Sequence, residues 1–197
     1  MDPHSLAGSP VNRVFGVVVG IVIDNKDPEK EYRVKVKFPW VQEAGDFTDA
    51  KDEADFPSTW CRIATFMSGP DRGAFWLPEV NDEVLIAFEH GDIRRPFVIG
   101  SLWNPIDPTI HDNDSQDGKN NFRTIFSRSG NVIQFQDDAD NKVERIILQT
   151  KVQTGDAAKG PLDRDGHMIV IDHSDGAEQI YVSDREQKNY ILIDMTN

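Results

Sequence analysis

The chain has 197 residues, with 34 acidic against 21 basic side chains and a formal net charge of −13. An acidic surface does not suit the phosphate backbone of a nucleic acid, which is bound by clustered Lys and Arg, so we expect no nucleic-acid partner. The one cysteine, Cys61, permits no disulfide within the chain and no cysteine-rich zinc site, and we expect it to be a small buried thiol.

The first part of the chain predicts two strands and a long loop. Residues 1–11 are polar and patternless, which is typical of a flexible leader or a cloning remnant. The sequence predicts strands at residues 14–24 and 31–38. In the second strand the apolar residues Val34, Val36 and Phe38 alternate with basic residues, so one face is expected to be buried. The acidic segment 41–57 is long for a loop in a compact domain and indicates a functional or mobile segment.

Further strand patterns predict that this part of the chain closes into a barrel. They lie at 59–66, 74–77, 83–89 and 96–102, and the glycine-containing run Ser68–Gly73 reads as a turn between strands. Several short strands with one long loop favour a small closed barrel over an open sheet. Residues 105–121 are polar and contain two prolines, so we expect a linker and a domain boundary there.

The C-terminal part is a series of short strands with a repeat of eleven residues. Strands are predicted at 122–127, 131–136 and 143–152. In the repeat, Ile169, Ile180 and Ile191 share one phase, and two places later stand Ile171, Val182 and Ile193. Because strand side chains alternate between faces, each repeat places two β-branched residues on one face. This pattern fits a β-meander in a monomer as well as an apolar stripe that other copies cover.

Motifs for catalysis, phosphate binding and metal binding are missing. The sequence has no G-x-S-x-G, Walker or G-x-G-x-x-G motif. The run Asp112–Gly118 resembles a calcium loop, but Asp117 stands where glycine is needed and Arg123 stands where glutamate is needed. His167 and His173 share a strand face but lie about 20 Å apart, too far for one metal ion. We therefore expect no catalytic residue, no metal ligand and no cofactor.

The run from Trp60 to Asn104 carries a family resemblance, and a second stretch extends it. The matching positions are Trp60-x-Arg62, Gly69, Gly73, Leu77-Pro78-Glu79-Val80, Asp82-Glu83-Val84-Leu85, Phe88, Gly91-Asp92, Arg94-Arg95-Pro96 and Gly100 to Asn104. The second match covers Asn120-Asn121, Arg123, Ile125, Ser127 to Gly130, Phe135 and Asp137. This pattern resembles the OB-fold domain of the VgrG family and of contractile-tail phage central spikes (baseplate assembly protein V), over about residues 12–150.

The resemblance implies an all-β homotrimer with an OB-fold barrel over 12–104, a linker over 105–121 and an intertwined triple-stranded β-helical needle over 122–197. It implies that strand edges in the needle pair with neighbouring chains. The apolar trimer core would then consist of Ile133, Phe135, Ile169, Ile171, Ile180, Val182, Ile191 and Ile193.

The implied function is that of a non-enzymatic central spike in a contractile injection system: a phage tail, a type VI secretion system or an extracellular relative. The spike would cap the inner tube and puncture the target envelope, passing transiently through its membrane. Implied partners are the tube protein, baseplate components and a PAAR-repeat tip protein. With no secretory signal pattern and no long apolar run, we expect synthesis in the cytoplasm and assembly into a particle.

Departures from the family pattern leave other readings open. Only about a dozen residues precede the barrel, where full VgrG proteins carry a tube-docking module, and no lysozyme domain follows it. The sequence stops within the repeat at Asp194 to Asn197, which indicates a truncated chain. The alternative function is an OB-fold module that binds oligonucleotides or oligosaccharides, for which Trp40, Trp60, Trp76 and Trp103 could stack bases. An enzyme acting on cell-wall glycan is a third reading.

Overall fold

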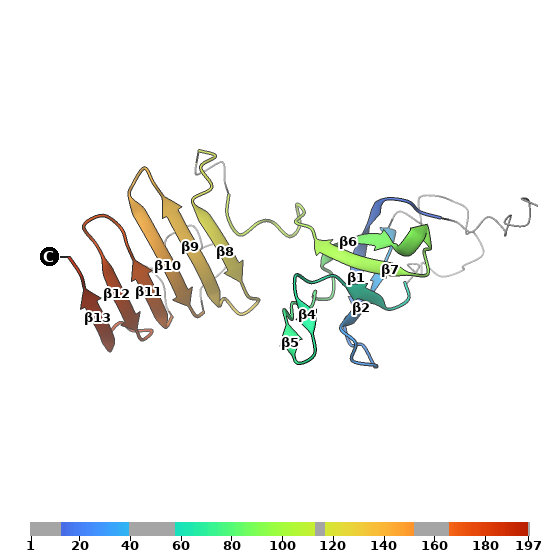
Figure 1. Cartoon of the computed structure of the whole chain (residues 1–197), viewed down its shortest axis with the longest axis horizontal. Coiled ribbons are helices and arrows are strands. Elements are labelled where there is room, and N and C mark those ends of the chain that lie inside the picture. Colours follow the sequence, from blue (N-terminus) through green and yellow to red (C-terminus); the bar gives the residue numbers. More distant parts are fainter. Residues whose placement is uncertain (1–12, 40–57, 113–116, 152–165, 197) are drawn as a thin grey trace, which may run out of the picture. The chain divides into compact units, whose positions relative to one another are not determined.

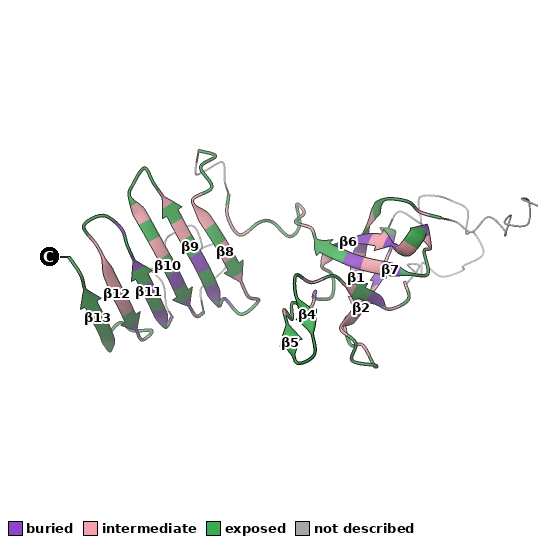
Figure 2. Cartoon of the chain, in the orientation of Figure 1, coloured by how far each residue is buried: buried purple, intermediate pink, exposed green. Residues whose placement is uncertain are grey.

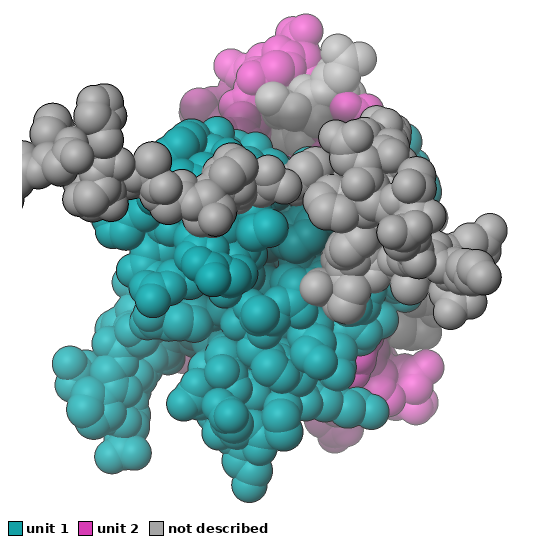
Figure 3. All heavy atoms as spheres, turned by 90° about the vertical axis from the view of Figure 1, so that its right-hand side faces the viewer, with its two compact units in different colours: residues 1–107 teal, residues 108–197 magenta. Residues whose placement is uncertain are grey.

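The chain folds into two compact units, residues 1–107 and 108–197, which Figure 3 draws in teal and magenta. Within them, the computed structural model describes residues 13–39, 58–112, 117–151 and 166–196. The predicted leader over 1–11 and the acidic loop over 41–57 lie outside the described residues. The division between the units falls inside the expected linker 105–121, and the domain bounds stay a prediction.

The first unit is a closed five-stranded barrel in the order β1-β2-β3-β7-β6 (Figure 1). Neighbouring strands are antiparallel except β3 and β7, which are parallel. This arrangement confirms the predicted barrel of the OB type. The strands are β1 (Val17–Asp24), β2 (Arg33–Lys37), β3 (Cys61–Ile63), β6 (Glu83–Phe88) and β7 (Pro96–Ser101).

Alternation of apolar and polar residues builds the barrel core. On β2, Val34 and Val36 are fully buried, while the basic residues between and beside them stay partly exposed. β6 follows the same pattern, with Val84, Ile86 and Phe88 inside. The core cluster contains Val22, Val34, Val36, Phe38, Cys61, Val84, Ile86, Phe88 and Val98. The predicted buried thiol of Cys61 is confirmed, since that residue has no exposed surface.

A small hairpin replaces one predicted strand. The segment 74–77 is not a strand, so that prediction is wrong. Instead, two short strands precede it, β4 (Ser68–Gly69) and β5 (Arg72–Gly73). The turn predicted over Ser68–Gly73 is therefore confirmed only for residues 70–71. After β5 the Trp76 backbone N–H donates to the Tyr32 hydroxyl at 2.8 Å, a side-chain partner, so no sheet ladder continues. The predicted strand over 59–66 is likewise shorter, covering only β3.

Helix is nearly absent, as predicted, in the part of the chain that the structure describes. The single-turn 3₁₀ helix η1 (Glu89–Gly91) joins β6 to the loop before β7. No helix among the described residues has the length and apolar character that a membrane span requires.

The second unit is a six-stranded antiparallel sheet in the order β13-β12-β11-β10-β9-β8 (Figure 1). Each strand pairs with the next one along the chain. The strands are β8 (Phe122–Phe126), β9 (Val132–Asp138), β10 (Val143–Gln149), β11 (Met168–Asp172), β12 (Gln179–Ser183) and β13 (Tyr190–Asp194). The last three begin eleven residues apart, so the predicted repeat of strands is confirmed.

Strand pairing within the chain bears on the expected trimer. In the single chain described, β9, β10, β11 and β12 each have both neighbours in the same chain. The expected pairing of strand edges with neighbouring chains stays a prediction. The intertwined β-helix of three chains stays a prediction.

Candidate functional site

One face of the C-terminal sheet carries two uninterrupted rows of apolar side chains. Residues that lie opposite each other in neighbouring strands point to the same side of a sheet, so the pairing register defines the rows. The first row is Ile125, Ile133, Leu148, Ile169, Val182 and Ile191. The second row is Phe135, Ile146, Ile171, Ile180 and Ile193. We call these residues the isoleucine face.

The isoleucine face is open. Ten of its side chains are large hydrophobics between 36% and 65% exposed, and Ile180 is half-buried. Along β9, β10 and β11 these exposed residues alternate with buried ones, and β13 is exposed along its whole length (Figure 2). Monomeric soluble proteins rarely expose so large an apolar patch, and such patches mark interaction sites.

The opposite face of the same sheet is buried over β9, β10 and β11, whereas Tyr190 and Leu192 of β13 are exposed on that side. Its apolar centre is Ile147, Met168 and Val170, with Tyr181 packed against them. Beside this centre, Arg145 donates from Nε to the Asp172 carboxylate at 2.6 Å, and the Asp172 side chain is fully buried. Because the opposite face is covered over β9 to β11, the isoleucine face is the side on which these strands can receive another surface.

Polar residues border the isoleucine face at the strand ends. His167 and His173 are exposed and lie directly before and after β11, which carries Ile169 and Ile171. Ile169 and Val182 line a shallow groove together with His167. Among the described residues, no group of three or more His, Cys, Asp or Glu side chains is arranged to hold a metal ion.

All eight residues predicted for the trimer core lie together on the isoleucine face. Ile133 and Phe135 come from β9, and the other six come from β11, β12 and β13. Their adjacency in one surface follows from the pairing of β9 with β10 and of β10 with β11. Their burial between chains stays a prediction.

The sequence reasoning missed three members of this face: Ile125, Ile146 and Leu148. The sequence of β10 is Val-Glu-Arg-Ile-Ile-Leu-Gln, with apolar residues at both odd and even positions. Alternation alone therefore does not show which residues point to which face of the sheet. The signal that could have found them is the neighbouring strand, since Ile133 and Phe135 on β9 lie opposite Leu148 and Ile146.

Basic side chains of the barrel lie over two of its aromatic rings. This concerns the alternative function, binding of oligonucleotides. The Lys35 ammonium lies 5.0 Å from the centre of the Trp60 ring, and the Arg33 guanidinium lies 6.0 Å from it. Arg62 lies over the Phe97 ring at 5.6 Å in the same manner. These aromatic faces are engaged by cations of the chain itself, so they are not free platforms for base stacking.

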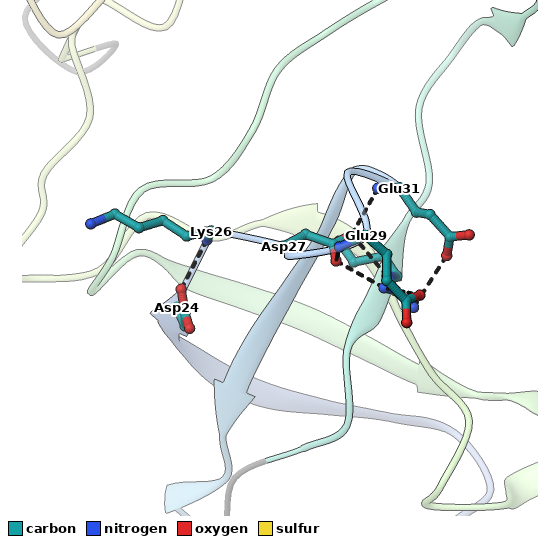
Figure 4. A network of polar contacts seen from close by, with 6 residues as sticks. Asp24, Lys26, Asp27, Glu29 and Glu31 are labelled. Carbon is teal, nitrogen blue, oxygen red and sulfur yellow. Dashed lines mark hydrogen bonds and ion pairs between the residues drawn. The ribbon is translucent and has the colours of Figure 1, made fainter.

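The turn between β1 and β2 is held by an ionic network (Figure 4). Arg33 binds Asp27 in a two-pronged contact, with Nε and Nη2 donating at 2.9 and 2.8 Å. Its guanidinium also pairs with Glu29 and Glu31, at 2.7 and 3.2 Å. The hydrogen bonds from Arg33 hold the pKa of Asp27 well below its usual range. This basic residue therefore serves the turn rather than a bound polyanion.

The thiol of Cys61 is the sort of group that could act as a nucleophile, but its surroundings oppose this. Burial raises the pKa of Cys61 to about 11, although a hydrogen-bonding contact with Ser58 works in the other direction. At neutral pH the group is a neutral thiol, whereas a nucleophilic cysteine needs the thiolate.

The barrel is similar to a known family of domains. A family model described as the type VI secretion system/phage-baseplate injector OB domain matches residues 18–103. The matched region begins inside β1 and ends just after β7, so it covers the five barrel strands and the β4–β5 hairpin.

The chain is also similar to curated spike proteins. It is 31% identical over 104 residues to type VI secretion system spike protein VgrG1c of Pseudomonas aeruginosa, covering 50% of this chain and 13% of that protein. It is 26% identical over 137 residues to VgrG1a of the same organism, covering 67% and 20%. For VgrG3 of Vibrio cholerae the identity is 28% over 121 residues, covering 60% and 11%. The chain thus spans a fifth or less of the length of these relatives.

Proposed function

Because residues 18–103 match the family model of the type VI secretion system/phage-baseplate injector OB domain, we propose that this chain is a spike subunit of a contractile injection system. The curated relatives, which are named spike proteins, support this role. The system would be a type VI secretion apparatus, a phage tail or an extracellular relative.

The observation that carries the proposal is the open isoleucine face. We infer that three copies bring their isoleucine faces together about a common axis, so that each sheet forms one side of a three-sided needle. Completing the burial of ten half-exposed apolar side chains contributes on the order of 1 kcal/mol each before association costs. This gain must also exceed the repulsion between chains that each carry a net charge of −13.

In this proposal the two units have different roles. Residues 12–104 would be the OB barrel, 105–121 a linker and 122–197 the needle. The barrel would connect the needle to the tube protein and baseplate components, and a PAAR-repeat protein would sit at the tip. The chain would be assembled into a particle after synthesis in the cytoplasm and driven through a target membrane.

The proposed role is mechanical and not enzymatic. The neutral thiol of Cys61 and the sequence without nucleophile motifs support this. A puncturing part needs stiffness, and strands held by continuous ladders supply it. Binding of oligonucleotides is not proposed as a second function. Trp76 and Trp103 are exposed, but the chain carries a net charge of −13, and the guanidinium of Arg33 is engaged by Asp27, Glu29 and Glu31. Trp40 lies outside the described residues.

The native mass of the purified chain tests the proposal. Light scattering or sedimentation should give about three times the chain mass of 22.2 kDa. A monomer mass over a wide range of concentrations would rule out the needle. Assays of peptidoglycan clearing and of single-strand DNA binding with the same preparation should both be negative.

A further inference from the structure

Three glutamine side chains form a polar stripe on the face of the C-terminal sheet that lies opposite the isoleucine face. Gln134 and Gln136 lie on β9, and Gln149 lies on β10. The register places Gln134 opposite Ile147, so Gln149 is its diagonal neighbour, at a Cα separation of about 7–8 Å. Gln136 is two positions from Gln134 on the same strand, about 7 Å away. We call these three residues the glutamine stripe.

The amide groups of the glutamine stripe are buried without hydrogen bonds. Gln134 is 1% exposed and Gln149 is 3% exposed. Nε2 of Gln134, Oε1 of Gln136 and both amide atoms of Gln149 are buried and have no hydrogen-bond partner among the residues that the structure describes. Burying an amide without a hydrogen bond is costly, so native proteins supply a partner for nearly every such group. The stripe is therefore a place where a small ligand is needed.

Apolar residues flank the stripe within the sheet. Ile147 separates Gln149 from Arg145 along β10, and Met168 lies opposite Gln149 on β11. Both apolar residues are at most 2% exposed. A ligand of the amides must therefore be small enough for a closely packed interior, and it must be uncharged, because burial of an unpaired charge is costly.

Polar groups next to the stripe are engaged with other partners. Thr124 lies opposite Gln134, and its hydroxyl is 2.7 Å from Nε2 of His111. Arg145 lies opposite the third glutamine of the stripe, and its Nε donates to the Asp172 carboxylate. Because Arg145 and Asp172 neutralise each other, they leave no net charge that would attract an ion to the stripe.

We propose that the glutamine stripe is a binding site for ordered water molecules. The ligand has to accept hydrogen bonds from the NH₂ groups of Gln134 and Gln149 and to donate to the oxygens of Gln136 and Gln149. Water does both, carries no charge and fits a packed interior, where a buried water makes about three hydrogen bonds to otherwise unpaired groups. A folded unit with the length of residues 108–197 contains about three such waters, at roughly one per 27 residues.

The bound waters would act as part of the sheet. They would fix the rotamers of the three side chains and link β9 to β10 by a polar network in addition to the backbone ladder. The site lies within one chain, so it is independent of the isoleucine face and of the proposed trimer.

NMR on the full chain, deuterated and labelled with ¹⁵N in glutamine, tests the site directly. The side-chain amide protons of Gln134 and Gln149 should show rotating-frame Overhauser cross peaks to the water resonance, with the sign of a long-lived contact. Gln187 is the control, because it is exposed in the turn between β12 and β13 and its water contacts should be too short-lived to give such peaks. Gln134→Met and Gln149→Met assign the signals, each by the loss of one amide pair.

Thermal melting gives a second readout. Met has nearly the size of Gln and no amide, so Gln149→Met removes the buried polar group without opening a cavity. If water satisfies the amide in the original chain, this variant should melt at the same temperature or lower. If the amide has no partner, its removal should instead raise the melting temperature by about 4 °C or more. Gln187→Met should melt like the original chain.

Three results would overturn the proposal. The first is the lack of long-lived water contacts at both Gln134 and Gln149. The second is a hydrogen bond from either amide to a protein carbonyl, detected as a scalar coupling across the bond, since the chain itself would then supply the partner. The third is the higher melting temperature of Gln149→Met. None of these measurements depends on the native mass, so this proposal and the proposed trimer fail separately.

Discussion

Arg145 and Asp172 form an ion pair across β10 and β11, with 2.6 Å between Nε and Oδ2, on the buried face of the C-terminal sheet. The Asp172 side chain is inaccessible, and 20% of the Arg145 side chain is exposed. Ser174 adds a backbone hydrogen bond of 2.9 Å to the same carboxylate. The pair marks the covered side of the sheet and leaves the isoleucine face on the other side.

Removing Arg145 should destabilise the sheet strongly. Arg145→Met leaves the Asp172 carboxylate buried without its cation, and breaking a buried pair from one side costs about 3–5 kcal/mol. Hydrogen exchange of the β10 and β11 amides, followed by mass spectrometry on the full chain, should show faster exchange in both strands. The double variant Arg145→Met/Asp172→Asn should recover most of the protection, and exchange as fast as in the single variant would contradict this account.

A charge in the centre of the isoleucine face should prevent assembly. Ile180 lies between Ile171 and Ile193 in the register, so Ile180→Asp would place a carboxylate within the proposed apolar core. The native mass should fall from about three chains to one chain of 22.2 kDa.

The matched control for this variant is Ile106→Asp, because Ile106 is 88% exposed and belongs to the first unit. It should leave the mass unchanged. A trimer of Ile180→Asp with an unaltered melting temperature would refute the assignment of this face as the core.

Gly166 should not tolerate a side chain. A Cβ atom there would lie 1.9 Å from the Thr150 carbonyl oxygen, which belongs to the backbone and cannot rotate away. Gly166→Ala should lower the free energy of unfolding by roughly 1–3 kcal/mol, as overpacking does. Gly100→Ala is the control, since no atom lies within 4 Å of its added Cβ, and thermal melting should separate the two variants. Equal melting temperatures would mean that the backbone near Thr150 adjusts freely.

Asp92 should titrate at unusually low pH. Hydrogen bonds from the Arg94 side chain and backbone lower the pKa of Asp92 from 3.8 to about 2. A carboxylate with a lowered pKa stabilises the fold above its unfolded pKa, so this contribution should be lost as the pH falls from about 4 to about 2. Carboxyl chemical shifts measured by NMR should show the pKa of Asp92 rising toward 3.8 in Arg94→Gln. Arg95→Gln should move it much less, because Arg95 pairs with Glu89 instead, and similar shifts in the two variants would be inconsistent with the assignment.

The barrel could be predicted from the sequence because several short strand-like runs follow one another and one of them, β2, alternates cleanly between apolar and basic residues. On β2, each buried valine stands between partly exposed basic residues. Because only every second residue is apolar, only one face of this strand can be the one that points into the core. The strands of the hairpin β4–β5 could not be predicted from alternation. Phe75 and Leu77 look like a strand, but the Trp76 N–H is taken by the Tyr32 hydroxyl from a distant part of the chain.

The repeat of eleven residues predicted some members of the isoleucine face but not all of them. Ile169, Ile180 and Ile191 follow from the spacing of eleven residues. Ile146 and Leu148 do not, because β10 has apolar residues at both parities and only its pairing with β9 and β11 assigns them. The contact between Tyr32 and Phe75, which are far apart in sequence, was likewise not predictable from local pattern.

The amino-acid sequence by itself determined the local features of this protein: short strands, their alternating faces, the repeat of eleven residues and an acidic surface. These depend on side-chain type and on neighbours within a few positions, which a sequence states directly. Only the tertiary structure decided which strands pair, and therefore that β8 to β13 form one sheet within a single chain. It also decided that the isoleucine rows stay open while Asp172 and Arg145 lie on the covered side, because burial depends on what packs against a face and not on the face alone.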